Sequence, residues 1–207
     1  MPRASEHRNR FTGLRGQKFE GIDNTILIQA FGQQGNCMEQ HFQMFAWYNR
    51  WANELLYAAA ADLSDEEYRL DLGLFFGSIH RTRNHLLVTD RIWMKRFTGE
   101  GDHPKQLDAI ITDNFITLRD LRHAEDERIC RYTNGLNAEK LAGRFTYTTV
   151  SDMRTMSQRL APSLAHLFNH QTHHRGQIHA ALTRLGTSAP SLDLSQFQRT
   201  EGGRRFA

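Results

Sequence analysis

The sequence is poor in cysteine and has no long apolar run. Its two cysteines, Cys37 and Cys130, do not form a CxxC pair, so neither a disulfide framework nor a cysteine-based zinc site is expected. No apolar stretch approaches the roughly 20 residues of a membrane span, and the first residues lack the apolar core of a signal peptide. We therefore expect a protein of the reducing cytoplasm that does not contact a membrane.

A large excess of charge of one sign is also missing. Lys+Arg number 26 and Asp+Glu 23, which gives a formal net charge of +3, and no basic stripe runs along the chain. Nucleic acid is therefore not an expected partner. With 207 residues, 39% of them hydrophobic and 24% charged, the composition is typical of one globular domain with a full core.

Residues 1–37 differ in composition from the rest of the chain. They are rich in Gly, Gln, Arg and Asn, and their one apolar patch, at 26–28, shows no helical period. We expect a flexible, disordered N-terminal extension, or residues added by an upstream start codon ahead of a natural start at Met38. An ordered arm that covers the domain is the alternative.

Four segments after Met38 have the three- and four-residue apolar spacing of helices. A capping box from Ser64 to Glu67 predicts a short additional turn, whereas residues 143–151 are β-prone. Mostly short connections favour an all-α four-helix bundle over residues 38–199, followed by an irregular tail that includes residues 200–207. The expected helices are Met38 to about Asp62, Phe75 to Thr98, Ile110 to Thr133 and Met156 to Leu185.

Four of the eleven histidines lie between His166 and His174. On a helix, His170 and His174 stand one above the other, because residues four apart share a face. This pair predicts a two-imidazole site for a divalent metal, and a solvated histidine face is the alternative. His166 extends the stripe as an outer partner, His173 lies at its edge, and His179 lies one turn beyond it.

A metal bound by two imidazoles needs a third ligand from another part of the fold. The helix expected over 75–98 offers His80 and His85. About 90° separates His85 from the centre of the apolar stripe of this helix, and about 140° separates His80 from it on the far side. His85 reaches an inward pocket more easily, but these angles leave both residues open, and His41 and His123 are weaker alternatives.

Two separated motifs resemble those of the DinB family of damage-inducible bacterial proteins, within the DinB/YfiT-like superfamily. They are the segments 84–93, which reads NHLLVTDRIW, and 169–177, which reads NHQTHHRGQ. The resemblance covers about Met38 to Arg199. It implies a four-helix bundle of up-down-down-up type, often a homodimer, with a divalent metal bound by three histidines.

Carried over to this sequence, the resemblance assigns His85, His170 and His174 as metal ligands. His174 is selected over its neighbour because the family's second ligand on the last helix directly precedes Arg-Gly-Gln. Zinc or nickel is the expected metal, and no further catalytic residue is assigned. Superfamily relatives that transfer low-molecular-weight thiols imply metal-activated thiol transfer, with a small thiol as partner. Hydrolysis is the second reaction, and a non-catalytic, stress-associated metal-binding protein is the alternative.

Residues around the expected site suggest supporting contacts. Asp90 and Arg91 are expected to form an ion pair or to bond to the ligands, and Trp93 is expected to pack in the core. Asn49 and Asn53 are four residues apart on the first helix. We expect both asparagines to line the mouth of the metal-site pocket.

Overall fold

The computed structural model describes residues 24–150 and 152–207, so the expectation for residues 1–23 lies outside the described part. The chain divides into two compact units, Met1–Gln34 and Gly35–Ala207. The first unit contributes only the beginning of helix α1 to the described residues. The bundle and all the sites discussed below belong to the second unit.

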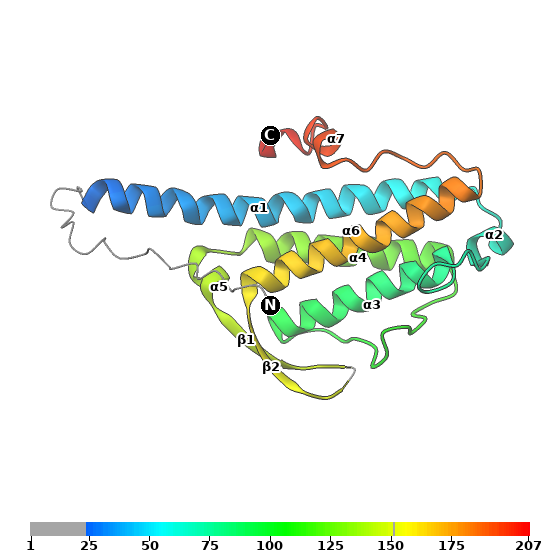
Figure 1. The fold of residues 1–207 in the computed structure, drawn as a ribbon, viewed down its shortest axis with the longest axis horizontal. Coiled ribbons are helices and arrows are strands. Elements are labelled where there is room, and N and C mark those ends of the chain that lie inside the picture. Colours follow the sequence, from blue (N-terminus) through cyan, green and yellow to red (C-terminus); the bar gives the residue numbers. More distant parts are fainter. Residues whose placement is uncertain (1–23, 151) are drawn as a thin grey trace, which may run out of the picture. The chain divides into compact units, whose positions relative to one another are not determined.

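The second unit is an all-α bundle with one small hairpin. In Figure 1, α1 and α6 run in one direction and α3 and α4 run in the opposite one, which is the expected up-down-down-up arrangement. Short helices and turns fill the connections and the tail. The long helices are α1 (Asn24–Ala59), α3 (Ile79–Thr98), α4 (Phe115–Asn134) and α6 (Leu160–Arg184), and the short elements are α2 (Asp65–Arg69), α5 (Ala138–Ala142), α7 (Leu194–Gln198) and a 3-10 turn (Arg204–Phe206).

Helix α1 begins at Asn24, so the prediction of an irregular segment up to Met38 is wrong for the residues from Asn24 onward. Gly32 and Gly35 each disfavour a helix by about 1 kcal/mol relative to alanine. For this reason the sequence of this stretch did not indicate a helix. Once a helix is formed, each added residue brings a further backbone hydrogen bond. A helix anchored by buried residues from Phe42 onward can therefore extend through both glycines.

Two other helices begin later than predicted, because a side chain caps each N-terminus. α3 begins at Ile79 rather than Phe75, where the Ser78 hydroxyl accepts from the N–H of Arg81. Phe75 lies in the preceding loop and is 80% exposed, so it does not belong to the apolar stripe. α4 begins at Phe115 rather than Ile110, after the N-cap Asn114.

The β-prone segment forms the first strand of a hairpin, as predicted. Strand β1 (Arg144–Thr148) pairs antiparallel with β2 (Thr155–Arg159), with Arg144 opposite Arg159 and Thr148 opposite Thr155. Helix α6 therefore begins at Leu160 rather than Met156, because its expected first turn is committed to the hairpin ladder. The tail, expected to be irregular, contains α7 and the 3-10 turn.

The connection from α3 to α4 is long, because these neighbouring helices run in the same direction. Residues 99–114 return along the bundle (Figure 1). The Asn84 side chain anchors this crossover, accepting from the N–H groups of Ile111 and Thr112 at 2.8 and 3.3 Å. The crossover covers the side of α3 that would otherwise face solvent, so α3 is buried nearly all round.

The core has a polar middle layer between apolar ends. One apolar cluster contains Phe42, Met94 and Leu164, and another contains Leu56 and Ile178. On each long helix, buried polar residues fall in sequence between the apolar residues of the two ends. They include Asn49 and Asn53 on α1, His85 and Asp90 on α3, Arg122 and Asp126 on α4, and Gln171, His174 and Arg175 on α6.

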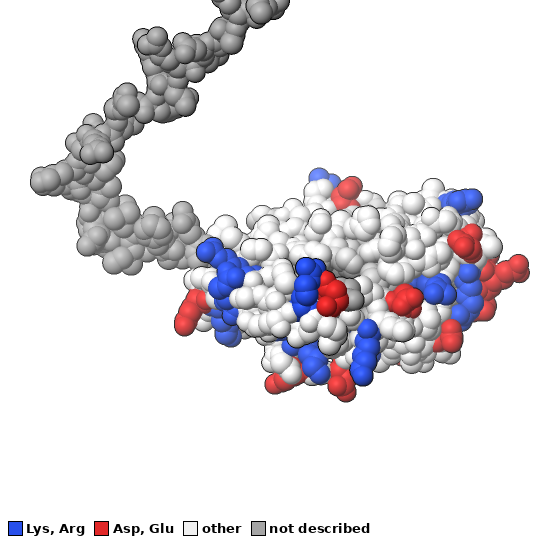
Figure 2. Space-filling view, turned by 60° about the horizontal axis from the view of Figure 1, so that its bottom comes forward, with Lys and Arg blue, Asp and Glu red and all other residues white. Residues whose placement is uncertain are grey.

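The surface carries charges of both signs. On the face shown in Figure 2, Lys and Arg side chains are interspersed with Asp and Glu among broad uncharged areas. Within the described part of this face, charge of one sign does not gather into a large patch. None of the helices in the described residues combines the length and the apolar character needed to cross a membrane.

Candidate metal centre

Three histidines from two helices meet in the polar middle layer. His85 comes from α3, and His170 and His174 come from consecutive turns of α6. One ring nitrogen from each lies within 4.8 Å of the others. The Nε2 atoms of His85 and His170 are 3.2 Å apart. The structure therefore brings together the residues that the resemblance assigns as ligands.

Hydrogen bonds orient two of the three rings. His85 Nδ1 lies 2.7 Å from the carbonyl oxygen of Leu107, and His174 Nδ1 lies 2.8 Å from the side-chain oxygen of Gln177. Carbonyl and amide oxygens can only accept, so each Nδ1 carries the proton and each Nε2 keeps a free lone pair. Metal-binding histidines in proteins are oriented by this kind of contact.

All three imidazoles are held in the neutral form. Burial lowers the pKa of His170 to about 3, with further repulsion from His174 and His85. Burial also lowers the pKa of His85 to about 4, partly opposed by the Leu107 carbonyl. The pKa of His174 is lowered by burial as well. Lone pairs are therefore available at neutral pH without loss of a proton, which favours binding of a cation.

The donor set and its spacing fit a divalent transition metal. Zn–N bonds of 2.0–2.1 Å in a tetrahedral site separate two nitrogens by about 3.3 Å, close to the 3.2 Å between the Nε2 atoms of His85 and His170. Nδ1 of His170 is buried and has no hydrogen-bond partner among the described residues. Imidazole nitrogens suit zinc and nickel better than magnesium or calcium.

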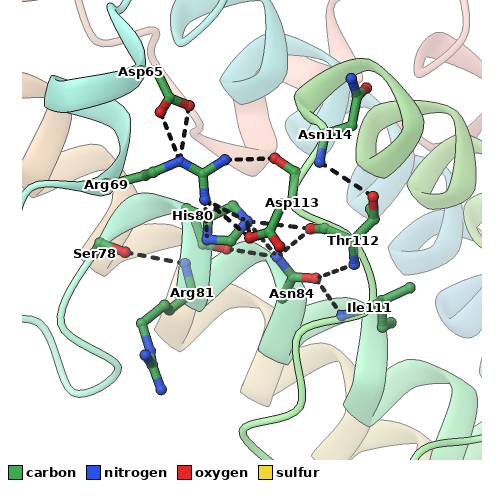
Figure 3. Close-up of polar contacts among 10 residues, drawn as sticks. All are labelled: Asp65, Arg69, Ser78, His80, Arg81, Asn84, Ile111, Thr112, Asp113 and Asn114. Atoms are coloured by element: carbon green, nitrogen blue, oxygen red, sulfur yellow. Dashed lines mark hydrogen bonds and ion pairs between the residues drawn. The ribbon is translucent and has the colours of Figure 1, made fainter.

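His80 belongs to a different cluster, at the crossover (Figure 3). Its ring lies 3.2 Å from the carbonyl oxygen of Thr112 and 3.4 Å from a guanidinium nitrogen of Arg69. Arg69 forms ion pairs with Asp65 and Asp113. His80 is buried because the crossover covers its side of α3, and it is not part of the three-histidine group.

The remaining candidate histidines lie outside the group of three. His166 is exposed, and its ring centroid is 5.9 Å from that of His170. His173 is exposed and contacts Gln177, at the edge of the stripe as predicted. His41 packs at the edge of Phe42 and Phe45, and His123 is exposed on α4.

A buried charge network fills the other side of the polar layer. Asp90 pairs with Arg122 at 2.7 Å, so the predicted pairing with Arg91 is wrong. Arg122 also pairs with Asp126 at 2.9 Å. Helices α3 and α4, which run parallel, are thus joined by charges that are almost completely removed from solvent.

Asn49 and Asn53 belong to this network. Both donate to Asp126, at 3.0 and 3.1 Å, and Asn49 also accepts from Arg175. The two residues are only 1% and 4% exposed. The prediction that they line the mouth of the metal-site pocket is therefore wrong. Trp93 is half-buried and packs against the apolar cluster, as predicted.

Sequence reasoning missed the groups that orient the histidines. Phe76 stacks on His85, with ring centroids 3.8 Å apart, but it lies in a segment that was predicted to be helical. Leu107 contributes only its backbone oxygen, which no side-chain pattern can reveal. The contact of Gln177 with His174 could have been predicted, because a spacing of three residues puts the two side chains on one helix face.

Comparisons with known proteins agree with this architecture. Residues 38–205 match the model of the DinB family. The chain is 26% identical over 159 residues to Protein DinB of Bacillus subtilis (strain 168), covering 70% of this chain and 86% of that protein. A DinB-like protein from Bacillus cereus has the same fold, with a TM-score of 0.53 at 16% identity over 68% of this chain and 89% of that one. The chain belongs to the DinB family.

Proposed function

We propose that this protein is a divalent-metal-dependent enzyme whose metal, zinc or nickel, is bound by His85, His170 and His174. The reaction is transfer to or from a metal-activated thiol, or hydrolysis. The observation that carries the proposal is the convergence of three neutral imidazoles within 4.8 Å, two of them oriented by Nδ1–H hydrogen bonds.

The donor set supports a reactive site rather than a closed one. Among the described residues, the group contains three ligand side chains and no fourth histidine, cysteine or carboxylate. Catalytic zinc sites have three protein ligands and an open position, whereas structural sites have four. Since imidazoles are neutral, a bound divalent ion keeps its full charge and supplies Lewis acidity that lowers the pKa of a thiol or water.

The residues around the three histidines keep the rings neutral and in the tautomers that suit metal binding. Leu107 and Gln177 fix the tautomers of His85 and His174, and Phe76 covers one face of the His85 ring. Burial keeps protons off the rings at neutral pH.

A cobalt-substituted form tests the proposal. Addition of 2-mercaptoethanol should change the visible absorption of Co²⁺ and add a thiolate charge-transfer band, because an open position accepts the thiolate. His85→Ala, mixed with the same Co²⁺, should give neither feature. A spectrum that responds to pH but not to the thiol favours hydrolysis. Bound Co²⁺ with a spectrum that responds to neither supports the alternative, a non-catalytic stress-associated metal-binding protein.

We further propose that the protein is a cytoplasmic homodimer that does not bind nucleic acid. The resemblance to the DinB family supports the dimer, and the near balance of charges supports the absence of a nucleic-acid partner. Sedimentation equilibrium should give twice the chain mass of 24.0 kDa. A monomer at all concentrations would contradict the dimer.

A further inference from the structure

A second feature of the bundle lies beside the histidine cluster, where the hairpin meets α3 and α6. An open pocket of about 600 Å³ is lined by Trp93 of α3, by Arg144 and Tyr147 of β1, by Arg159 at the end of β2, and by His166 of α6. Its lining contains no acidic residue. Such a volume is within the usual range for sites that bind small molecules.

Two arginines without acidic partners, Arg144 and Arg159, line this pocket. Arg144 and Arg159 stand directly opposite each other in the hairpin register, and like charges at opposed positions destabilise a strand pair. No carboxylate among the described residues lies within 4.0 Å of Arg96, Arg144 or Arg159. By contrast, Arg154 at the tip of the same hairpin is paired with Asp152.

Arg96 is held in place by the aromatic walls. Its guanidinium carbon lies 4.5 Å from the ring centroid of Trp93 and 4.1 Å from that of Tyr147. Burial lowers the pKa of Arg96, because desolvation of this cation is not offset by a nearby carboxylate. Arg96 does not itself line the pocket, but it adds a positive charge beside two of the aromatic side chains that do.

The pocket and the candidate metal centre are adjacent. His166 lines the pocket, with its ring centroid 5.1 Å from Trp93 and 5.9 Å from His170. His166 and His170 are one turn apart on α6, a rise of about 6 Å. A small molecule with its acidic group in the pocket can therefore reach the histidine cluster with another group.

We propose that this pocket is the substrate-anchoring subsite of the metal centre, and that the substrate is a small anion whose carboxylate or phosphate binds Arg144 and Arg159. Trp93 and Tyr147 provide an apolar wall for the part of the substrate next to the acidic group. Binding at the subsite is non-covalent and uses no group of the metal centre. The assignment as a substrate subsite rests on the proposed function, but the presence of the anion site does not.

Calorimetric titration of the full chain with phenyl phosphate tests the subsite, both with metal bound and after metal removal with EDTA. Benzoate tests the carboxylate, and phenol is the neutral control. We expect saturable binding of at least one of the two anions, with phenol weaker. Arg159→Gln and Arg144→Gln should each raise the dissociation constant about tenfold or more, since each removes charge-assisted hydrogen bonds.

Arg119→Gln is the matched control, because Arg119 is an exposed arginine on α4 that contacts Asp120. It should leave the dissociation constant unchanged. Absence of saturable anion binding, or equal affinity in all three variants and the wild type, would overturn the subsite. Anion binding that persists in a protein unable to retain metal would instead uphold the anion site and refute the proposed metal-dependent function, so the two failures are distinguishable.

Discussion

The histidine cluster should make the metal-free protein unstable in acid. An imidazole of an unfolded chain has a pKa of about 6.5, whereas burial lowers the pKa to about 4 for His85 and about 3 for His170. Below about pH 6.5, these two histidines therefore bind protons in the unfolded state but remain neutral in the folded state. The stability that the neutral rings allow is fully present above about pH 6.5 and is lost as the pH falls toward the folded pKa values.

The size of this loss follows from the pKa difference. A pH of 5 is about 1.5 units below the pKa of an unfolded histidine, and each unit corresponds to about 1.36 kcal/mol. Each ring that stays neutral in the folded state therefore lowers the free energy of unfolding by about 2 kcal/mol at pH 5. The two rings together would cost about 4 kcal/mol. Because His170 is only partly buried, solvent screens part of this effect. We expect a loss of about 2–4 kcal/mol between pH 7 and pH 5.

Urea unfolding of EDTA-treated protein, followed by far-UV circular dichroism at both pH values, measures this loss. The double variant His85→Gln/His170→Gln should lose about 2–4 kcal/mol less than the wild type between pH 7 and pH 5, since all other titrating groups are shared. His123→Gln, at an exposed position on α4, is the control and should behave as the wild type does. Equal losses in the wild type and the double variant would refute the reasoning.

Two further predictions concern the buried polar groups that support the site. Arg122→Met should lower the free energy of unfolding by about 3–5 kcal/mol at pH 7, because Asp90 and Asp126 lose their buried counter-ion. In that variant, urea unfolding should show stability recovering as the pH falls and these carboxylates become protonated. Asn84→Ala should cost about 1–3 kcal/mol, since the buried side chain no longer accepts from the N–H of Ile111. Amide hydrogen exchange should be faster at Ile111 in this variant.

Neighbouring positions provide the comparisons for both predictions. Arg119→Met removes an exposed arginine from the same helix and should cost under about 0.5 kcal/mol. A loss under about 1 kcal/mol in Arg122→Met would show that the buried pairs are not the support inferred here. Unchanged hydrogen exchange at Ile111 in Asn84→Ala would show that the crossover does not depend on that side chain.

Patterns confined to one helix could be predicted from the sequence. The four-residue step from His170 to His174 indicated a shared face, and the two rings do point to a common centre, with centroids 4.5 Å apart. The β-prone segment around Phe145 and the capping box at Ser64 were also correct, because both depend on local chemistry. The long helices were identified, although side-chain caps and the hairpin moved several of their N-termini.

Features that depend on contacts between distant segments could not be predicted. The positions of His80 and His85 around α3 did not decide which of them is the third ligand. The crossover that contacts His80 and covers its side of the helix has no hydrophobic periodicity by which the sequence would reveal it. The partner of Asp90 is Arg122 rather than the adjacent Arg91, since adjacent residues on a helix point in different directions. Sequence spacing cannot show which helix will supply the counter-charge.

The most direct test of the central claim is elemental analysis of the purified protein beside four alanine variants. We predict about one divalent ion per chain in the wild type and in His80→Ala, and loss of most of it in His85→Ala, His170→Ala and His174→Ala. The His80 variant controls for the loss of a buried histidine from the same helix as His85. Full metal content in the three cluster variants, or no metal in the wild type under replete conditions, would contradict the account.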